Sequence, residues 1–131
     1  MSTTLTVRDE TTGGGPPREF ALELLTERIT VRELIRSRVY QEVQDYNRRQ
    51  PPVFQGLVQP TEAERAQNGY ALRKPRTIDW KKQYDKAVEA FQAHGILILV
   101  DDKQVASLDE EIVVRPETRV SFLRLTMLVG G

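Results

Sequence analysis

The sequence contains no cysteine, which excludes disulfide bonds, thiolate metal sites and a thiol nucleophile. Its single histidine, His94, cannot form a metal site by itself. No stretch approaches the roughly 18 apolar residues of a membrane helix, and the first residues lack the apolar run of a signal peptide. We therefore expect a soluble cytoplasmic protein without metal, cofactor or membrane association.

An excess of charge of either sign is also missing, since 19 basic residues balance 19 acidic ones. No overall field then draws the protein onto nucleic acid, so partners must be recognised by local patches. The basic positions at 73–76 and 81–82 could hold phosphate or an acidic partner, although a solvated loop before a helix is the commoner arrangement.

Groups able to carry out catalysis are scarce. The acidic residues near the C-terminal end have no regular metal-ligand spacing, and turn and capping roles explain them: Asp101, Asp102, Asp109, Glu110 and Glu111. One histidine among scattered carboxylates offers no pair of nucleophile and base. We expect that the protein is not an enzyme.

The first half of the chain predicts a hairpin followed by a helix. Polar and apolar residues alternate over 3–8 and again over 20–24, and the glycines and prolines of 11–17 separate these two strands. Thr30 and Glu33 form a capping box at a helix start. Apolar residues then follow helical spacing until Arg48-Arg49, and Pro51-Pro52 cannot continue the helix.

Residues 51–94 have the character of an insertion. A second capping box, from Thr61 to Glu64, predicts a short helix that ends near Gly69. A longer helix running to His94 and stopping at Gly95 is predicted by regularly spaced apolar residues: Trp80, Tyr84, Val88 and Phe91. We expect this face to dock the insertion on the sheet, with a partner-binding groove as the alternative.

The last part of the chain predicts three further strands. Residues 96–100 are apolar throughout, as in a central strand, and Asp101-Asp102 marks a tight turn into a returning strand at 103–105. A capped turn follows at 107–110. Alternation returns at 119–123, with Val120 and Phe122 on one face.

This order of elements resembles the β-grasp fold, in which a helix crosses a hairpin and the last strand returns beside the first. The residues from Ile96 to Gly131 are also similar, element by element, to the C-terminal half of ubiquitin, including the Lys103-Gln104 pair and the final Gly130-Gly131. The resemblance implies an α+β, ubiquitin-like β-grasp domain over 1–131. It has a helical insertion at 51–94, between main helix and third strand, and a flexible tail at 124–131.

The resemblance implies a function for the terminal glycines. Members of the family are adenylated at the final carboxylate, passed to an enzyme cysteine as a thioester, and conjugated to an amine of a target protein. Glycine lets the tail lie extended in the narrow channel of the activating enzyme. The implied partners are activating and conjugating enzymes, a target and a deconjugating protease, in a bacterial system encoded beside those enzymes.

Resemblance also suggests the contact residues. Leu99 and Leu123 would lie on the sheet surface that ubiquitin uses for partners, unless Leu99 belongs to the core or the second helix covers this face. Lys103 is the candidate acceptor lysine for chain formation. Met127-Leu128-Val129 is apolar where ubiquitin has arginines, which implies a dedicated activating enzyme that contacts Arg124, Met127 and Leu128.

A different class of function stays open. The glycine pair could be a frayed end, in which case the chain would be a β-grasp adaptor. Such an adaptor would never be conjugated and would hold a protein partner through its sheet face or its insertion.

Overall fold

The computed structural model describes residues 3–12, 16–66, 69–72, 74 and 76–125, with side chains omitted at 65–66. Within these ranges the chain forms a mixed α+β fold with a five-stranded mixed sheet. The elements are β1 (Thr3–Thr11), β2 (Arg18–Leu24), β3 (Arg28–Thr30), α1 (Val31–Arg49), β4 (Ala63–Ala66), β5 (Gly69–Leu72), α2 (Trp80–Gln92), β6 (Ile96–Val100), β7 (Lys103–Gln104), β8 (Glu111–Val113) and β9 (Arg119–Arg124).

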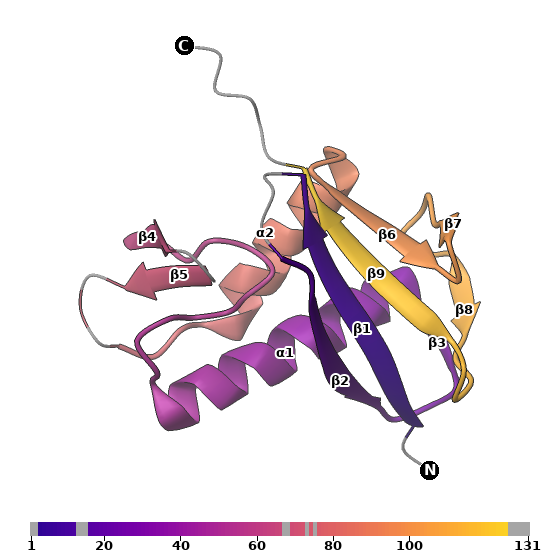
Figure 1. Ribbon diagram of the computed structural model, residues 1–131, viewed down its shortest axis with the longest axis horizontal. Coiled ribbons are helices and arrows are strands. Elements are labelled where there is room, and N and C mark those ends of the chain that lie inside the picture. Colours follow the sequence, from indigo (N-terminus) through magenta and orange to yellow (C-terminus); the bar gives the residue numbers. More distant parts are fainter. Residues whose placement is uncertain (1–2, 13–15, 67–68, 73, 75, 126–131) are drawn as a thin grey trace.

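The central sheet has the strand order β2-β1-β9-β6-β7, in which β1 and β9 are parallel and the other neighbours are antiparallel. Both helices lie behind the sheet in the view of Figure 1. The first and last strands of the chain are therefore adjacent at the centre of the sheet. None of the helices in the described ranges is long and apolar enough to span a membrane.

The alternation predicted at both ends of the chain orients the strands as expected. Leu5 and Val7 of β1 are fully buried, and Val120 and Phe122 of β9 lie beside them on the helix side of the sheet. Helix α1 begins at the predicted capping box, because Thr30 Oγ1 accepts the Glu33 N–H at 3.1 Å and Glu33 Oε1 accepts the Thr30 N–H at 3.3 Å. The predicted hairpin, helix and last strand are confirmed.

Helix α2 packs mainly on α1, whereas the sequence analysis expected it to dock on the sheet. The Trp80 ring meets Tyr40 of α1 edge to face, with centroids 5.3 Å apart. Ala87 and Phe91 are buried, while Trp80, Tyr84 and Val88 are half-buried. The helix ends at Gln92, and the left-handed residue after it is His94, at φ 64°, rather than the predicted Gly95.

The prediction of a short helix at Thr61 is wrong. Strands β4 and β5 form an antiparallel hairpin there, and an isolated bridge joins Phe54 to Tyr70. Local capping signals are weak compared with burial, and pairing with Phe54 buries Tyr70. Gly69 fits this site because its φ is 151° and a Cβ would collide with the Phe54 carbonyl.

The insertion contributes to the core, which its composition did not predict. Phe54 and Leu57 are 1% and 2% exposed, and Tyr46 of α1 packs its ring against Phe54 at 5.2 Å between centroids. Asn47 holds the other end of the segment, since its amide accepts the Ile78 N–H and donates to the Ile78 carbonyl. The insertion is thus held to α1 near its start, at Phe54, and again at Ile78 just before α2.

Turns in the last part follow the predicted positions. Asp101 and Asp102 both adopt positive φ, at 49° and 69°, and the Asp101 carboxylate accepts the Arg119 N–H at 2.9 Å. Strands β3 and β8 were not predicted, because each has only three residues. Arg124 is the last residue of β9, so the expected tail does not begin at 124.

Candidate functional site

The point where the chain leaves the sheet, Arg124–Leu125, is held by three other segments and is called the tail root here. The Arg124 carbonyl accepts the Thr12 N–H at 3.1 Å, and the Leu125 N–H donates to the Gly95 carbonyl at 2.9 Å. The Arg124 guanidinium donates to the Gly56 carbonyl of the insertion at 3.2 Å. The tail root therefore has a fixed position next to the insertion.

Four of the predicted site residues follow the tail root. Met127, Leu128, Gly130 and Gly131 lie in 126–131, outside the described residues. Arg124 was predicted as a contact for the activating enzyme, but its side chain is half-buried and reaches inward to Gly56. It positions the tail root rather than lying free on the surface.

Three leucines form a patch on the outer face of the sheet, opposite to the helices. Leu97 of β6 pairs directly with Leu123 of β9, and Leu99 lies two residues along β6. All three are half-buried, while their neighbours Ile96, Ile98 and Phe122 are buried on the helix side. Leu97, Leu99 and Leu123, called the leucine patch below, are not core residues.

The possible covering of this patch by the second helix does not occur, because α2 packs beside α1 on the other face (Figure 1). Leu97 was not singled out in the sequence analysis, because residues 96–100 are all apolar. Such a run does not show which side chains face the helices and which face outward. Lys103 lies exposed at the start of β7, the edge strand next to β6, and pairs in register with Val100.

A buried ionic network connects β1, α1 and the insertion. Arg38 of α1 donates to both carboxylate oxygens of Asp9, at 2.5 and 2.6 Å, and to Glu42 at 3.2 Å. The second oxygen of Glu42 accepts the Leu57 N–H at 3.0 Å. The Arg38 guanidinium also stacks on Phe122, 4.5 Å from the ring centroid.

Burial and charge act in opposite directions on the pKa values of this network. Burial raises the pKa of Glu42, and Arg38 only partly offsets the effect. Burial alone would lower the pKa of Arg38, but attraction to Glu42 and Asp9 outweighs it, so this pKa is raised. Burial lowers the pKa of Arg18, which lies 3.5 Å from Asp9.

The sequence analysis missed this network, although the sequence carried a signal for it. Asp9 continues the buried alternation of Leu5 and Val7, and Arg38 lies on the helix face of Ile35 and Val39. A charged residue in phase with a core face is rare unless it is paired. Two such residues of opposite charge are candidates for a buried ion pair.

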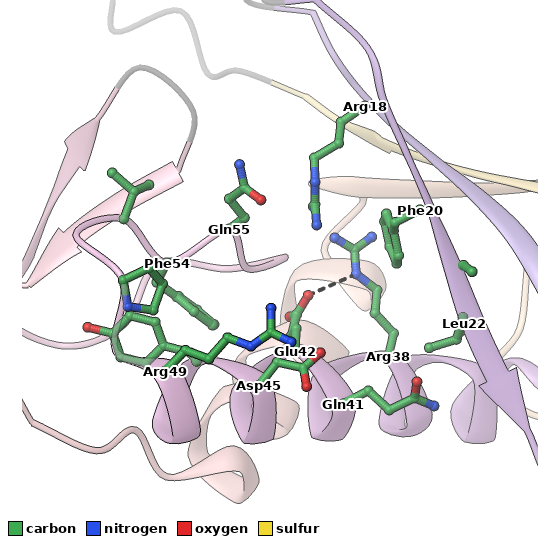
Figure 2. Close-up of a pocket in the computed structure, with 14 residues that line it drawn as sticks. Arg18, Phe20, Leu22, Arg38, Gln41, Glu42, Asp45, Arg49, Phe54 and Gln55 are labelled. Carbon is green, nitrogen blue, oxygen red and sulfur yellow. Dashed lines mark hydrogen bonds and ion pairs between the residues drawn. The ribbon is translucent and has the colours of Figure 1, made fainter.

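A cavity of about 300 Å³ opens beside the network, between β2, α1 and the loop after α1. Figure 2 shows side chains from all three segments around one space, with the Arg38 to Glu42 ion pair at its back. Its apolar lining includes Phe20, Leu22, Tyr46 and Phe54, and Arg18 and Arg49 add guanidinium groups. No acidic side chain in the described part of the chain forms an ion pair with Arg49.

The other residues considered in the sequence contribute no site. The Trp80 to Phe91 face is used in packing on α1, and Arg36 stacks on Trp80 at 5.3 Å from its centroid. Lys74 is exposed, and Arg76 donates to the carbonyl of Thr61. Among the described residues no three His, Cys, Asp or Glu side chains gather as a metal site would require.

Comparison with known proteins gives no identity for the chain. No family model, no curated protein sequence and no solved structure matches it.

Proposed function

We propose that the protein is a ubiquitin-like β-grasp modifier that is activated at Gly131 and conjugated to other proteins, with no catalytic activity of its own. The observation that carries the proposal is the position of β9, which lies parallel to β1 in the middle of the sheet and leads to the tail root. A hairpin, a crossing helix and a returning central last strand are the defining features of that fold. The Gly130-Gly131 end follows in the sequence.

The chemistry requires little of this chain except a reachable carboxylate. The Gly131 carboxylate would attack the α-phosphate of ATP and release pyrophosphate. A cysteine thiolate of the activating enzyme would then displace AMP and form a thioester. An amine of the target would attack the thioester, form an amide and release the thiolate. All catalytic groups belong to the partners.

The tail root and the leucine patch would have different roles in this scheme: the first positions the tail, and the second provides a contact surface for an enzyme. Arg124 and Leu125 are fixed by Thr12, Gly56 and Gly95, so the chain leaves the sheet at a constant place. The leucine patch offers apolar contact area on the face that the helices leave open. Leu123 of the patch directly precedes Arg124, so an enzyme bound to the leucine patch would lie next to the start of the tail.

The decisive experiment incubates the protein with an adenylating enzyme encoded beside it, ATP and magnesium. We expect an adduct that a thiol reductant cleaves, and its loss when Gly130 and Gly131 are deleted. The deletion should leave the melting temperature unchanged, because it removes only residues beyond β9. Gly131→Ala should impair the adduct less than the deletion. Full activity without both glycines would refute the modifier function.

The second candidate is an adaptor that is never conjugated, and the leucine patch favours it. An adaptor would bind its partner equally well with and without the last two residues, and Leu123→Asp would abolish the binding. A modifier would lose conjugation in both variants. The two functions are therefore separated by the glycine deletion.

A further inference from the structure

We propose that Glu42 of α1 acts in activation as a positioning residue. Through the peptide group between Gly56 and Leu57 of the insertion, it sets how Arg124 holds the start of the C-terminal tail for the activating enzyme. This role rests on the proposed function, because it assigns the insertion a part in the reaction at Gly131.

One peptide group of the insertion joins charged side chains from two other elements. The Gly56 carbonyl accepts a guanidinium N–H of Arg124 at 3.2 Å, and the Leu57 N–H donates to Glu42 Oε1 at 3.0 Å. This carbonyl and this N–H belong to the same peptide unit, called the linking peptide below. The linking peptide is trans, so the two groups point in opposite directions. It therefore connects α1 to the end of β9.

The linking peptide is held in place by packing. Leu57 is 2% exposed, and the ring of Phe54, 1% exposed, lies so close to Gly56 that a Cβ there would collide with it. Tyr46 of α1 packs on the Phe54 ring from the other element, with 5.2 Å between centroids. Closely packed interiors of this kind have low compressibility. The Gly56 carbonyl is therefore an acceptor in a constant place.

Opposite charges act on the two ends of the linking peptide. A carboxylate at the N–H and a guanidinium at the carbonyl both stabilise the same direction of the peptide dipole. Hydrogen bonds to charged groups are stronger than neutral ones, and bonds that polarise one group strengthen each other. Loss of the Glu42 bond should therefore weaken the Arg124 bond as well. Glu42 is itself bound to Arg38 at 3.2 Å, so the buried ionic network extends to the tail root.

Arg124 reaches the linking peptide because of its place in β9. Side chains alternate along a strand, so Arg124 lies on the same side of the sheet as the buried Phe122. Its carbonyl accepts the Thr12 N–H, and the following N–H, that of Leu125, donates to the Gly95 carbonyl. The insertion, which binds the side chain, thus helps to define where the chain leaves the sheet.

A fixed starting point for the tail should affect binding to the enzyme more than the chemical step. Pre-organisation of a bound segment reduces the entropy that is lost on association. Residues 125–130 separate Arg124 from Gly131, so Arg124 acts on where the tail starts and not on the reacting carboxylate. Loss of the Arg124 bond should raise the KM of the activating enzyme for this protein and leave kcat unchanged.

The test measures thioester formation by the activating enzyme at increasing concentrations of the full chain. Arg124→Met should raise KM at least about threefold at unchanged kcat, and Arg124→Lys, which keeps a donor for the Gly56 carbonyl, should raise it less. Glu42→Met should also raise KM, and Glu42→Gln, which keeps an oxygen acceptor for the Leu57 N–H, should do so less. Arg28→Met, which removes an exposed ion pair, is the control and should change neither constant.

The double variant Glu42→Met, Arg124→Met separates positioning from direct contact of Arg124 with the enzyme. Because both residues act through the linking peptide, its KM should be close to that of the worse single variant. Effects of independent contacts would multiply. Multiplied effects, an unchanged KM for Arg124→Met, or a fall in kcat at unchanged KM would overturn the proposal.

Amide hydrogen exchange tests the same coupling without the enzyme and without Glu42→Met, should that variant not fold. Arg124→Met should speed exchange of the Leu57 N–H at least about threefold. The Val105 N–H, which donates to the Ile98 carbonyl, is the internal control. Unchanged exchange at Leu57 would overturn the proposal. A wild-type chain that forms no thioester would refute the proposed function and this role together, whereas the other contrary results overturn this role alone.

Discussion

Arg38 and Asp9 form a bidentate ion pair inside the protein, with nitrogen to oxygen distances of 2.5 and 2.6 Å. The side chain of Arg38 is fully buried and that of Asp9 is 4% exposed. Because α1 supplies the arginine and β1 the carboxylate, the pair fixes the position of the helix on the sheet. Its disruption should therefore have a large effect.

Removing one partner of this pair should be strongly destabilising. We expect Arg38→Met to lower the free energy of unfolding by about 3 to 5 kcal/mol, because the buried carboxylates of Asp9 and Glu42 lose their shared guanidinium partner. Denaturant unfolding measures this. Arg28→Met is the control, since the Arg28 to Glu111 pair is exposed and should contribute at most about 1 kcal/mol. Equal losses in the two variants would contradict the prediction.

The raised pKa of Glu42 predicts a specific pH dependence. As pH rises from 4.5, the ordinary pKa, to the raised folded value, the unfolded chain loses this proton before the folded protein does. The contribution of Glu42 to stability therefore falls with increasing pH across that window. Unfolding of wild type and Glu42→Gln at a series of pH values should show wild type losing stability relative to the variant. A relative gain would show that the sign is wrong.

The last strand and the insertion should both be essential to the core. Phe122→Ala and Phe54→Ala should each cost about 3 to 5 kcal/mol, because both rings are almost fully buried. Leu25→Ala, at an 86% exposed position, is the control. An unchanged melting temperature for Phe54→Ala would contradict the packing described here.

Glycine at position 56 should be required, while glycine at 95 should not. A Cβ on Gly56 would collide with the buried ring of Phe54, whereas one on Gly95 meets only the Ala90 carbonyl at 3.5 Å. We expect Gly56→Ala to cost about 1 to 3 kcal/mol through overpacking. Thermal unfolding of both alanine variants compares them directly. A greater loss at Gly95 would be inconsistent with this prediction.

The leucine patch should act in binding more than in folding. Leu123→Asp should keep the fold, because the side chain is half-buried at the outer face, and should weaken partner association by about tenfold or more. Formation of the enzyme thioester measures this, and circular dichroism checks the fold. Val113→Asp, a change at a 45% exposed residue of β8, is the matched control. Unfolding of Leu123→Asp would assign Leu123 to the core.

The sequence predicted the elements whose signals are local. The Thr30 and Glu33 capping box, the alternation around Leu5 and Val120, and the double aspartate turn each depend on residues a few positions apart. Each of these local patterns determines the backbone conformation and the buried face of its own element. The structure therefore has these elements where the sequence predicts them. The same reasoning failed at Thr61, where the capping residues were correct for a helix but distant pairing with Phe54 determined the structure.

By itself the sequence determined the types of most elements, the buried faces of the alternating strands and the chemistry present at the chain's end. Only the tertiary structure decided that α2 packs on α1, that Leu97 joins Leu99 and Leu123, and that Phe54 packs against Tyr46. The physical reason is that these contacts join segments far apart in the chain. Burial and pairing between such segments depend on the packing of the whole molecule, which no local pattern of residues encodes.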